Sequence, residues 1–201
     1  MLQTLDTSRE PPATGYRATS PLRRLLRSRD GAAAIEFALL AIPYFLIVFA
    51  IIETFIAFTG EQLIANAVDT MARKLRTGQI TAANTSESAF RETFCDEISI
   101  LIQCNGTTDN KLILDVRSFS TFADIPTGIP RDGGEKFGDL EAEDNYTPGG
   151  SGTINMVRAY YRWEIVTDLV RPYISTIRPA DGSLPKEFLI VATAAFQNEG
   201  Y

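Results

Sequence analysis

The residue types that most often carry out chemistry are sparse in this chain. It has no histidine and two cysteines, Cys95 and Cys104. Without histidine, a Ser or Cys hydrolase lacks its usual general base and a metal site lacks its commonest ligand. Two cysteines that pair with each other leave no thiolate for zinc. We therefore expect no enzyme, no catalytic residue, and no metal or other cofactor.

Carboxylates and glycines gather between residues 123 and 153. The acidic residues there are Asp124, Asp132, Glu135, Asp139, Glu141, Glu143 and Asp144. Calcium is the alternative that such a group raises, but the spacing does not follow an EF-hand loop. The glycine run at 149–152 is followed by no lysine and opens no predicted helix, so it does not fit a phosphate-binding loop. We predict a long exposed loop over residues 124–153.

Glu36 is a carboxylate near the start of a long apolar run. No charged residue occurs between Phe37 and Ile52, and beyond the lone Glu53 the apolar character resumes as far as Thr59. A carboxylate near the centre of a membrane helix costs about 2 to 3 kcal/mol, so it is a functional candidate by default. The alternative is that Glu36 reaches the interface or stabilises the positive N-terminus of its helix.

The apolar run is long enough to cross a bilayer. As a helix, residues 32–59 would extend about 42 Å, more than the roughly 30 Å of a hydrocarbon core. A core helix of this length would show a polar stripe, and this run has none. Pro43 lies inside it and would remove one backbone hydrogen bond. The pattern predicts a transmembrane helix over residues 32–59.

Basic residues before the run predict its orientation. Residues 1–31 hold six arginines against three acids, a net +3, which leaves −9 for the rest of a chain of net charge −6. Lys and Arg in a short flanking segment favour the cytoplasmic side. We therefore expect a single-pass protein of the inner membrane, with residues 1–31 as a cytoplasmic leader or tail and residues 60–201 as a periplasmic domain. The arginines that we expect to set this topology are Arg23, Arg24, Arg27 and Arg29.

Two helices and three strands are predicted for the domain. The first helix continues to a stop at Gly78, and a second begins after Thr85 or Ser86 and ends near Cys104. Two cysteines of an exported domain favour a disulfide, the alternative being two unrelated buried thiols. Because nine residues span about 13 Å of helix, a Cys95–Cys104 bond requires that helix to end earlier.

Strand patterns occupy KLILDVRSFSTF, INMVRAYYRWEIVTDLV and EFLIVATAAFQNE, which begin at Lys111, Ile154 and Glu187. The first of these alternates apolar and polar residues, and the second is rich in aromatic and β-branched residues. We predict an α+β fold, in which the long helix packs on an antiparallel sheet of about three strands.

The start of the apolar run resembles a known signal. Basic residues are followed by Gly31, Ala32, Ala33, Ala34, Ile35 and Glu36. This arrangement resembles the class III signal of type IV pilin-like proteins. More narrowly, GAAAIEFALLAIPYFLIVFAIIE is similar to the TadE-like family of the tight-adherence, or Flp pilus, assembly system. The resemblance extends to the cysteine pair with the strand after it, to YRWEIVTDL and to TAAFQNE, and so covers residues 22–200 without the loop at 124–153.

The resemblance implies a pilin-like fold and a structural function. A prepilin peptidase would cut after Gly31 and leave Ala32 as the new N-terminus, and Glu36 would neutralise the terminal ammonium of a neighbouring subunit. The expected function is that of a minor pilin or pseudopilin in Flp pilus assembly, and the expected partners are other pilins or pseudopilins and the Tad assembly platform. The alternative is an uncleaved membrane anchor whose periplasmic domain scaffolds the complex or binds a ligand. We expect no nucleic-acid partner.

Overall fold

The computed structural model describes residues 29–104, 111–134, 137–168, 171–179 and 181–201. The expectations for the leader, including Arg23, Arg24 and Arg27, lie outside these residues. The chain divides into two compact units, Met1–Ile47 and Val48–Tyr201, and each is described by itself.

The long helix predicted at the N-terminus is confirmed as α2, Arg29–Arg76. Its part within the first unit continues through Pro43 without a break in the assigned helix. Side chains in this part are largely exposed, including those of Glu36 and Phe37. A helix with apolar residues on every side and no protein around it is typical of a membrane-spanning segment.

The second half of α2 carries the predicted apolar stripe. Ile64, Met71 and Leu75 have no exposed surface, and Ala67 and Val68 have almost none. The helix ends at Arg76, where the N–H of residue 78 donates to the carbonyl of Leu75. Gly78 has φ +73°, the left-handed conformation in which a helix commonly stops. Arg73, Lys74 and Arg76 occupy the last turn, where they complement the helix dipole.

The sheet has four strands in the order β2-β1-β3-β4. The three predicted strands are β1, Leu112–Phe119, β3, Ile154–Glu164, and β4, Glu187–Gln197, and they pair antiparallel to one another. The prediction of a three-stranded antiparallel sheet was wrong in one respect. A short strand within the predicted loop, β2 (Asn145–Thr147), pairs parallel to β1, so the sheet is mixed.

The segment before β2 also contributes to the structure. It contains the short helices η2, Phe122–Asp124, and η3, Asp132–Gly134, and residues 131 and 140 form an isolated antiparallel bridge. Leu140 is buried, although its sequence neighbours are polar. The connection from β3 to β4 carries one turn of helix, α4 (Arg171–Ile174).

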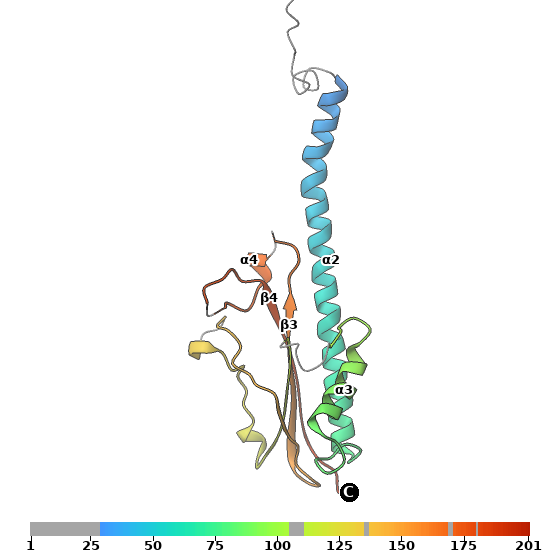
Figure 1. Cartoon of the computed structure of the whole chain (residues 1–201), viewed down its shortest axis with the longest axis vertical. Helices are drawn as coiled ribbons and strands as arrows, with labels where there is room; N and C mark the ends of the chain where they lie inside the picture. The colour runs from blue at the N-terminus through green and yellow to red at the C-terminus, as the bar shows by residue number, and fades with distance from the viewer. Residues whose placement is uncertain (1–28, 105–110, 135–136, 169–170, 180) are drawn as a thin grey trace, which may run out of the picture. The chain divides into compact units, whose positions relative to one another are not determined.

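Two apolar clusters hold the second unit together. The larger lies between α2, α3 (Glu87–Ile98) and one face of the sheet, to which β3 contributes Val157 and Ala159. The smaller lies on the opposite face, where Tyr160 packs with Leu140, Ile177 and Leu189. Figure 1 shows α2 and α3 on one side of the strands and the connecting loops on the other. This separation follows from the alternation of side chains along β3.

Candidate membrane anchor and assembly site

The first candidate feature is the apolar surface of α2. Within the described residues, α2 is the one helix that is long and apolar enough to cross a membrane, and none of its most apolar stretch is buried. The large apolar side chains exposed along it include Phe37, Leu39, Leu40, Ile42, Tyr44, Phe45, Ile47, Phe49, Ile51, Ile52, Phe55 and Phe58. A surface of this size is stable only in contact with lipid or with other apolar surfaces. A single helix of this kind indicates a membrane anchor.

Gly31 and Glu36 both lie in the first turns of α2. The Glu36 side chain is exposed, and no hydrogen bond or ion pair joins it to another described residue. Ala32 and Glu36 are four residues apart, so they share a helix face with a rise of about 6 Å between them. The roles predicted for Gly31, Ala32 and Glu36 remain predictions. Arg29 begins the helix, but its side chain is not among the described ones.

Glu53 is a second carboxylate of the apolar run, and its surroundings differ from those of Glu36. Only 9% of its surface is exposed. Its Oε1 accepts a hydrogen bond from the backbone N–H of Val166, and its Oε2 accepts one of 3.1 Å from Thr167. Both donors belong to the chain just after β3. Glu53 therefore ties α2 to the end of the sheet within the second unit.

The role of Glu53 was not predicted from the sequence. The available signal was its isolation, because it is the one charged residue among more than twenty apolar neighbours. Isolation indicates that a carboxylate needs a partner. It does not identify one that lies more than 110 residues further along the chain.

An apolar cavity of about 180 Å³ adjoins Glu53. Its lining comes from α2, from β3 and β4, and from the connection between these two strands. The lining residues include Ala57, Phe58, Trp163, Ile165, Ile174 and Phe188. Trp163 also lies against Gly60, where an added Cβ would be 2.9 Å from the indole ring. The cavity therefore lies where α2, the end of β3 and the start of β4 meet in the second unit.

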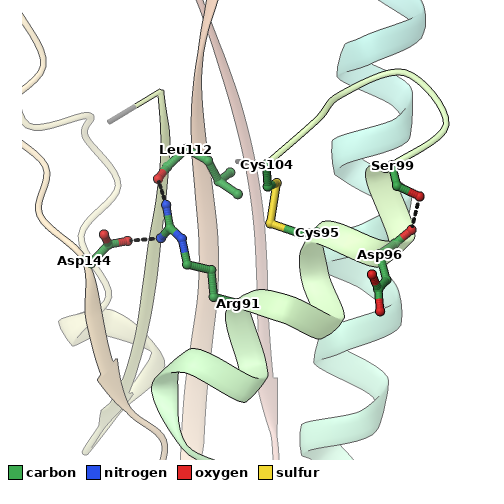
Figure 2. The surroundings of a disulfide bond; sticks show 7 residues. All are labelled: Arg91, Cys95, Asp96, Ser99, Cys104, Leu112 and Asp144. Atoms are coloured by element: carbon green, nitrogen blue, oxygen red, sulfur yellow. Dashed lines mark hydrogen bonds and ion pairs between the residues drawn. A yellow bond between two sulfur atoms is a disulfide. The ribbon is translucent and has the colours of Figure 1, made fainter. Parts of the chain in front are cut away.

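The predicted disulfide joins Cys95 and Cys104, with their Cα atoms 5.7 Å apart. The bond can form because α3 ends at Ile98, six residues before the expected stop. The helix is capped at its start by Ser86, whose hydroxyl accepts from the N–H of Ala89. Figure 2 shows the bond closing the segment that returns from α3 toward β1.

One turn before Cys95, Arg91 covers the open edge of β1. Its guanidinium donates to the carbonyl oxygen of Leu112 and pairs with Asp144 at 2.9 Å (Figure 2). The same carboxylate accepts from the N–H of Leu114 at 2.8 Å. These contacts satisfy backbone groups that β2 is too short to reach, and an edge covered in this way is less open to another strand.

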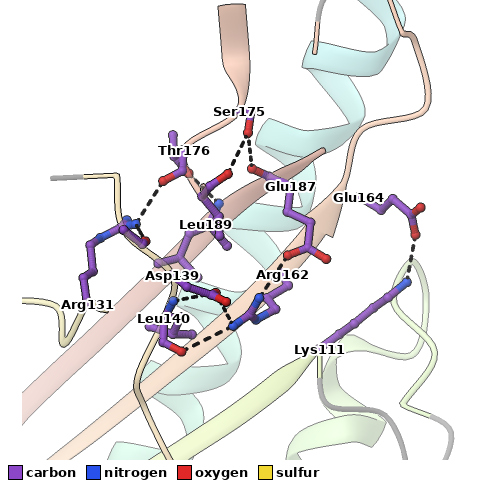
Figure 3. A network of polar contacts seen from close by, with 12 residues as sticks. Lys111, Arg131, Asp139, Leu140, Arg162, Glu164, Ser175, Thr176, Glu187 and Leu189 are labelled. Carbon is purple, nitrogen blue, oxygen red and sulfur yellow. Dashed lines mark hydrogen bonds and ion pairs between the residues drawn. The ribbon is translucent and has the colours of Figure 1, made fainter. Parts of the chain in front are cut away.

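The acidic segment is held by cations of the protein itself. Arg162 on β3 pairs with Asp139 at 2.8 Å and with Glu187 at 3.1 Å, and it also donates to the carbonyl of Leu140 (Figure 3). Arg131 donates to the carbonyl oxygens of residues 138 and 176, 2.9 Å away in each case. These two arginines hold residues 131–134 and 137–140 on the face of the sheet opposite α2 and α3.

Three of the described acidic residues in this segment bond to other described residues. Among the described residues, no group of three or more Cys, Asp and Glu side chains is placed to hold a metal ion. Of the acidic residues named in the segment, Asp139 and Asp144 are in ion pairs and Asp124 accepts from the backbone N–H and hydroxyl of Thr121. Glu135 lies outside the described residues. The contacts of Asp124, Asp139 and Asp144 therefore stabilise the folded segment.

The fold and the exposed helix define a class, that of an α+β protein whose described residues include one N-terminal helix suited to anchor it in a membrane. In a comparison with known families, residues 31–73 match the family model described as TadE-like protein. The resemblance of this segment to the TadE-like family is thereby confirmed. The match begins at Gly31 and contains both Glu36 and Glu53. No curated protein and no solved structure matches the chain significantly.

Proposed function

We propose that this protein is a non-enzymatic minor pilin or pseudopilin of a Tad, or Flp, pilus assembly system. The observation that carries the proposal is the TadE-like match, which starts at Gly31 and covers an exposed apolar helix with a carboxylate at its fifth position after the glycine. In this proposal, the helix holds the subunit in the inner membrane until assembly. The domain after it lies in the periplasm, consistent with the net +3 of residues 1–31.

A prepilin peptidase would remove residues 1–31 and leave Ala32 with a free ammonium group. That charge and the carboxylate of Glu36 are both costly in an apolar environment, and each is tolerated far better as part of a pair. The partner is a neighbouring subunit, whose ammonium meets Glu36 when the helices pack together. Other pilins or pseudopilins and the Tad assembly platform are then the partners of the apolar surface of α2.

Processing is tested by measuring the intact mass and N-terminal sequence of the protein from cells with the cognate peptidase. We expect an N-terminus at Ala32. Retention of Met1 in those cells would reject cleavage and favour the alternative, an uncleaved anchor with a scaffolding or ligand-binding domain.

Assembly is tested by comparing Glu36→Ala and Glu36→Gln with the unchanged protein. We expect both variants to insert into the membrane and to form the Cys95–Cys104 bond, but to support little or no pilus assembly. Thr59→Ala, a change on the same helix away from the signal, serves as the control. Normal assembly by the Glu36 variants would reject the charge-pairing function.

A further inference from the structure

The described residues of the β3–β4 connection, which are 165–168, 171–179 and 181–186, expose large apolar side chains. Val166, Tyr173 and Leu184 are 81%, 86% and 84% exposed. They lie in a segment that joins two antiparallel strands at one end of the sheet. Ile100, at 87%, is the one other large apolar side chain of the described residues exposed to this extent. Each of these side chains would gain by leaving water, so the connection is a candidate interaction surface.

The start of the connection lies beside α2 at a defined position along the helix. Because Glu53 accepts from the N–H groups of Val166 and Thr167, the start of the connection is level with residue 53. These residues all belong to the unit Val48–Tyr201. Figure 1 shows α4 and the end of β3 at the same end of the sheet.

The length of the apolar run indicates that residue 53 of α2 lies at the edge of a bilayer. Residues 32–52 form about six helical turns and extend roughly 31 Å, close to the thickness of a hydrocarbon core. A bilayer spanned by these residues ends just before Glu53. The headgroup layer beyond it is about 5 to 8 Å thick, which corresponds to about three to five residues of helix. Phe55 and Phe58, which are 69% and 58% exposed, are in or near this layer.

We propose that the β3–β4 connection is a second membrane contact, in which Val166, Tyr173 and Leu184 enter the headgroup region of the bilayer that α2 spans. The partner is the lipid surface. Val and Leu gain by leaving water, and Tyr suits a layer that is apolar on one side and wet on the other. Membrane contact also accounts for Glu53, because a carboxylate at this boundary loses water and gains two backbone N–H donors in its place. The transmembrane span then covers residues 32–52, and residues 54–59 lie at its interface.

This contact rests on the membrane anchorage by α2 and is independent of cleavage after Gly31. The test uses the full chain in lipid nanodiscs, with a spin label on a cysteine introduced at residue 166, 173 or 184. Collision of the label with oxygen, which concentrates in lipid, is compared with collision with a water-soluble nickel chelate. A label at Ile100 is the matched control for an exposed apolar site in water, and a label at Leu40 reports on α2.

We expect the ratio of oxygen to nickel accessibility at residues 166, 173 and 184 to be severalfold higher than at residue 100. Ratios equal to that at residue 100, together with a lipid-like ratio at residue 40, would overturn the proposed contact and leave the anchor intact. A water-like ratio at residue 40 would instead reject the anchor on which the contact depends.

A second measurement needs no substitution. A phospholipid with a photoreactive group near its headgroup is added to nanodiscs that contain the unchanged protein, and labelled peptides are identified by mass spectrometry. We expect labelling of peptides from residues 165–186 and none of peptides that contain Ile100. Labelling of α2 without labelling of the connection would contradict the proposal.

Discussion

At the residue scale, the two carboxylates of the apolar run have opposite surroundings. Glu53 is buried and bonded to two backbone N–H groups, whereas Glu36 is exposed with no partner among the described residues. A buried carboxylate with donors stabilises the fold that supplies them. An exposed carboxylate in an apolar helix must find its partner in another molecule or at the membrane surface.

Replacing Glu53 should therefore destabilise the domain. Glu53→Ala removes the acceptor of the Val166 and Thr167 N–H groups, and we expect the free energy of unfolding to fall by about 1 to 3 kcal/mol. Glu53→Gln keeps one acceptor oxygen and should lose less. Thermal unfolding in detergent micelles measures the change. Glu61→Ala, two turns further along α2, should lie within about 0.5 kcal/mol of the unchanged protein. Equal effects at positions 53 and 61 would show that the contact contributes nothing.

Tyr146 carries a buried hydroxyl without a hydrogen-bond partner among the described residues. The centroid of its ring lies 5.2 Å from the centroid of the Phe90 ring. Burial raises the pKa of Tyr146 above its ordinary value of 10.0. Below about pH 10, the folded and unfolded chains both hold this proton. As the pH rises toward the raised pKa, the unfolded chain loses the proton first, so the folded state loses stability.

Tyr146→Phe should remove the cost of the unpartnered buried hydroxyl and the pH dependence that its pKa causes. We expect the free energy of unfolding at neutral pH to stay the same or to rise by up to about 1 kcal/mol, because the unpartnered hydroxyl is gone. The decline of the free energy of unfolding above about pH 10 should be smaller than in the unchanged protein. Urea unfolding at several pH values measures both effects. Tyr173→Phe, at a position that is 86% exposed, is the control and should change neither.

At the scale of elements, the helix and strand patterns are well predicted because each follows from local periodicity. The stripe from Ile64 to Leu75, the stop at Gly78 and the three long strands are found where the sequence indicates them. The strand β2 was missed because three residues are too few to show alternation. It forms because Asp144, just before it, is held by Arg91 and by the N–H of Leu114.

The end of α2 provides a test of how the C-terminus is fixed. A Cβ at residue 78 would lie 2.6 Å from Cγ of Tyr201, and φ at this residue is +73°. Gly152 has a similar φ of +72°, and a Cβ there would meet no atom within 4 Å. Both Gly78→Ala and Gly152→Ala carry the left-handed strain of about 1 to 2 kcal/mol, but only the first displaces the tyrosine ring.

We therefore expect Gly78→Ala to destabilise the domain more than Gly152→Ala in chemical unfolding. In a Tyr201→Ala background, the costs of the two glycine substitutions should become similar. A difference that persists without the tyrosine ring would show that the contact with the C-terminus is not its cause.

At the scale of the whole molecule, the asymmetry of charge and the disulfide lead to one prediction. If residues 60–201 are exported, Cys95 and Cys104 are oxidised in cells, because disulfides persist in the periplasm and not in the cytosol. We expect a maleimide reagent to modify the denatured protein only after reduction. Replacing Arg23, Arg24, Arg27 and Arg29 with glutamine should increase the fraction that reacts without reduction, since less of the domain would be exported. Full oxidation in that variant would contradict the function of these arginines in setting the topology.

The sequence by itself predicted the apolar anchor helix and the α+β class, because these depend on composition and on short-range periodicity. The TadE-like segment was found by its resemblance to a family, and the cysteine count favoured a disulfide without excluding two separate thiols. The tertiary structure decided the strand order, the parallel addition of β2 and the end of α3 before Cys104. It also decided the partner of Glu53 and the exposure of Val166, Tyr173 and Leu184 in the β3–β4 connection. These features join residues far apart in the chain, and such contacts leave no periodic trace in the sequence of either partner.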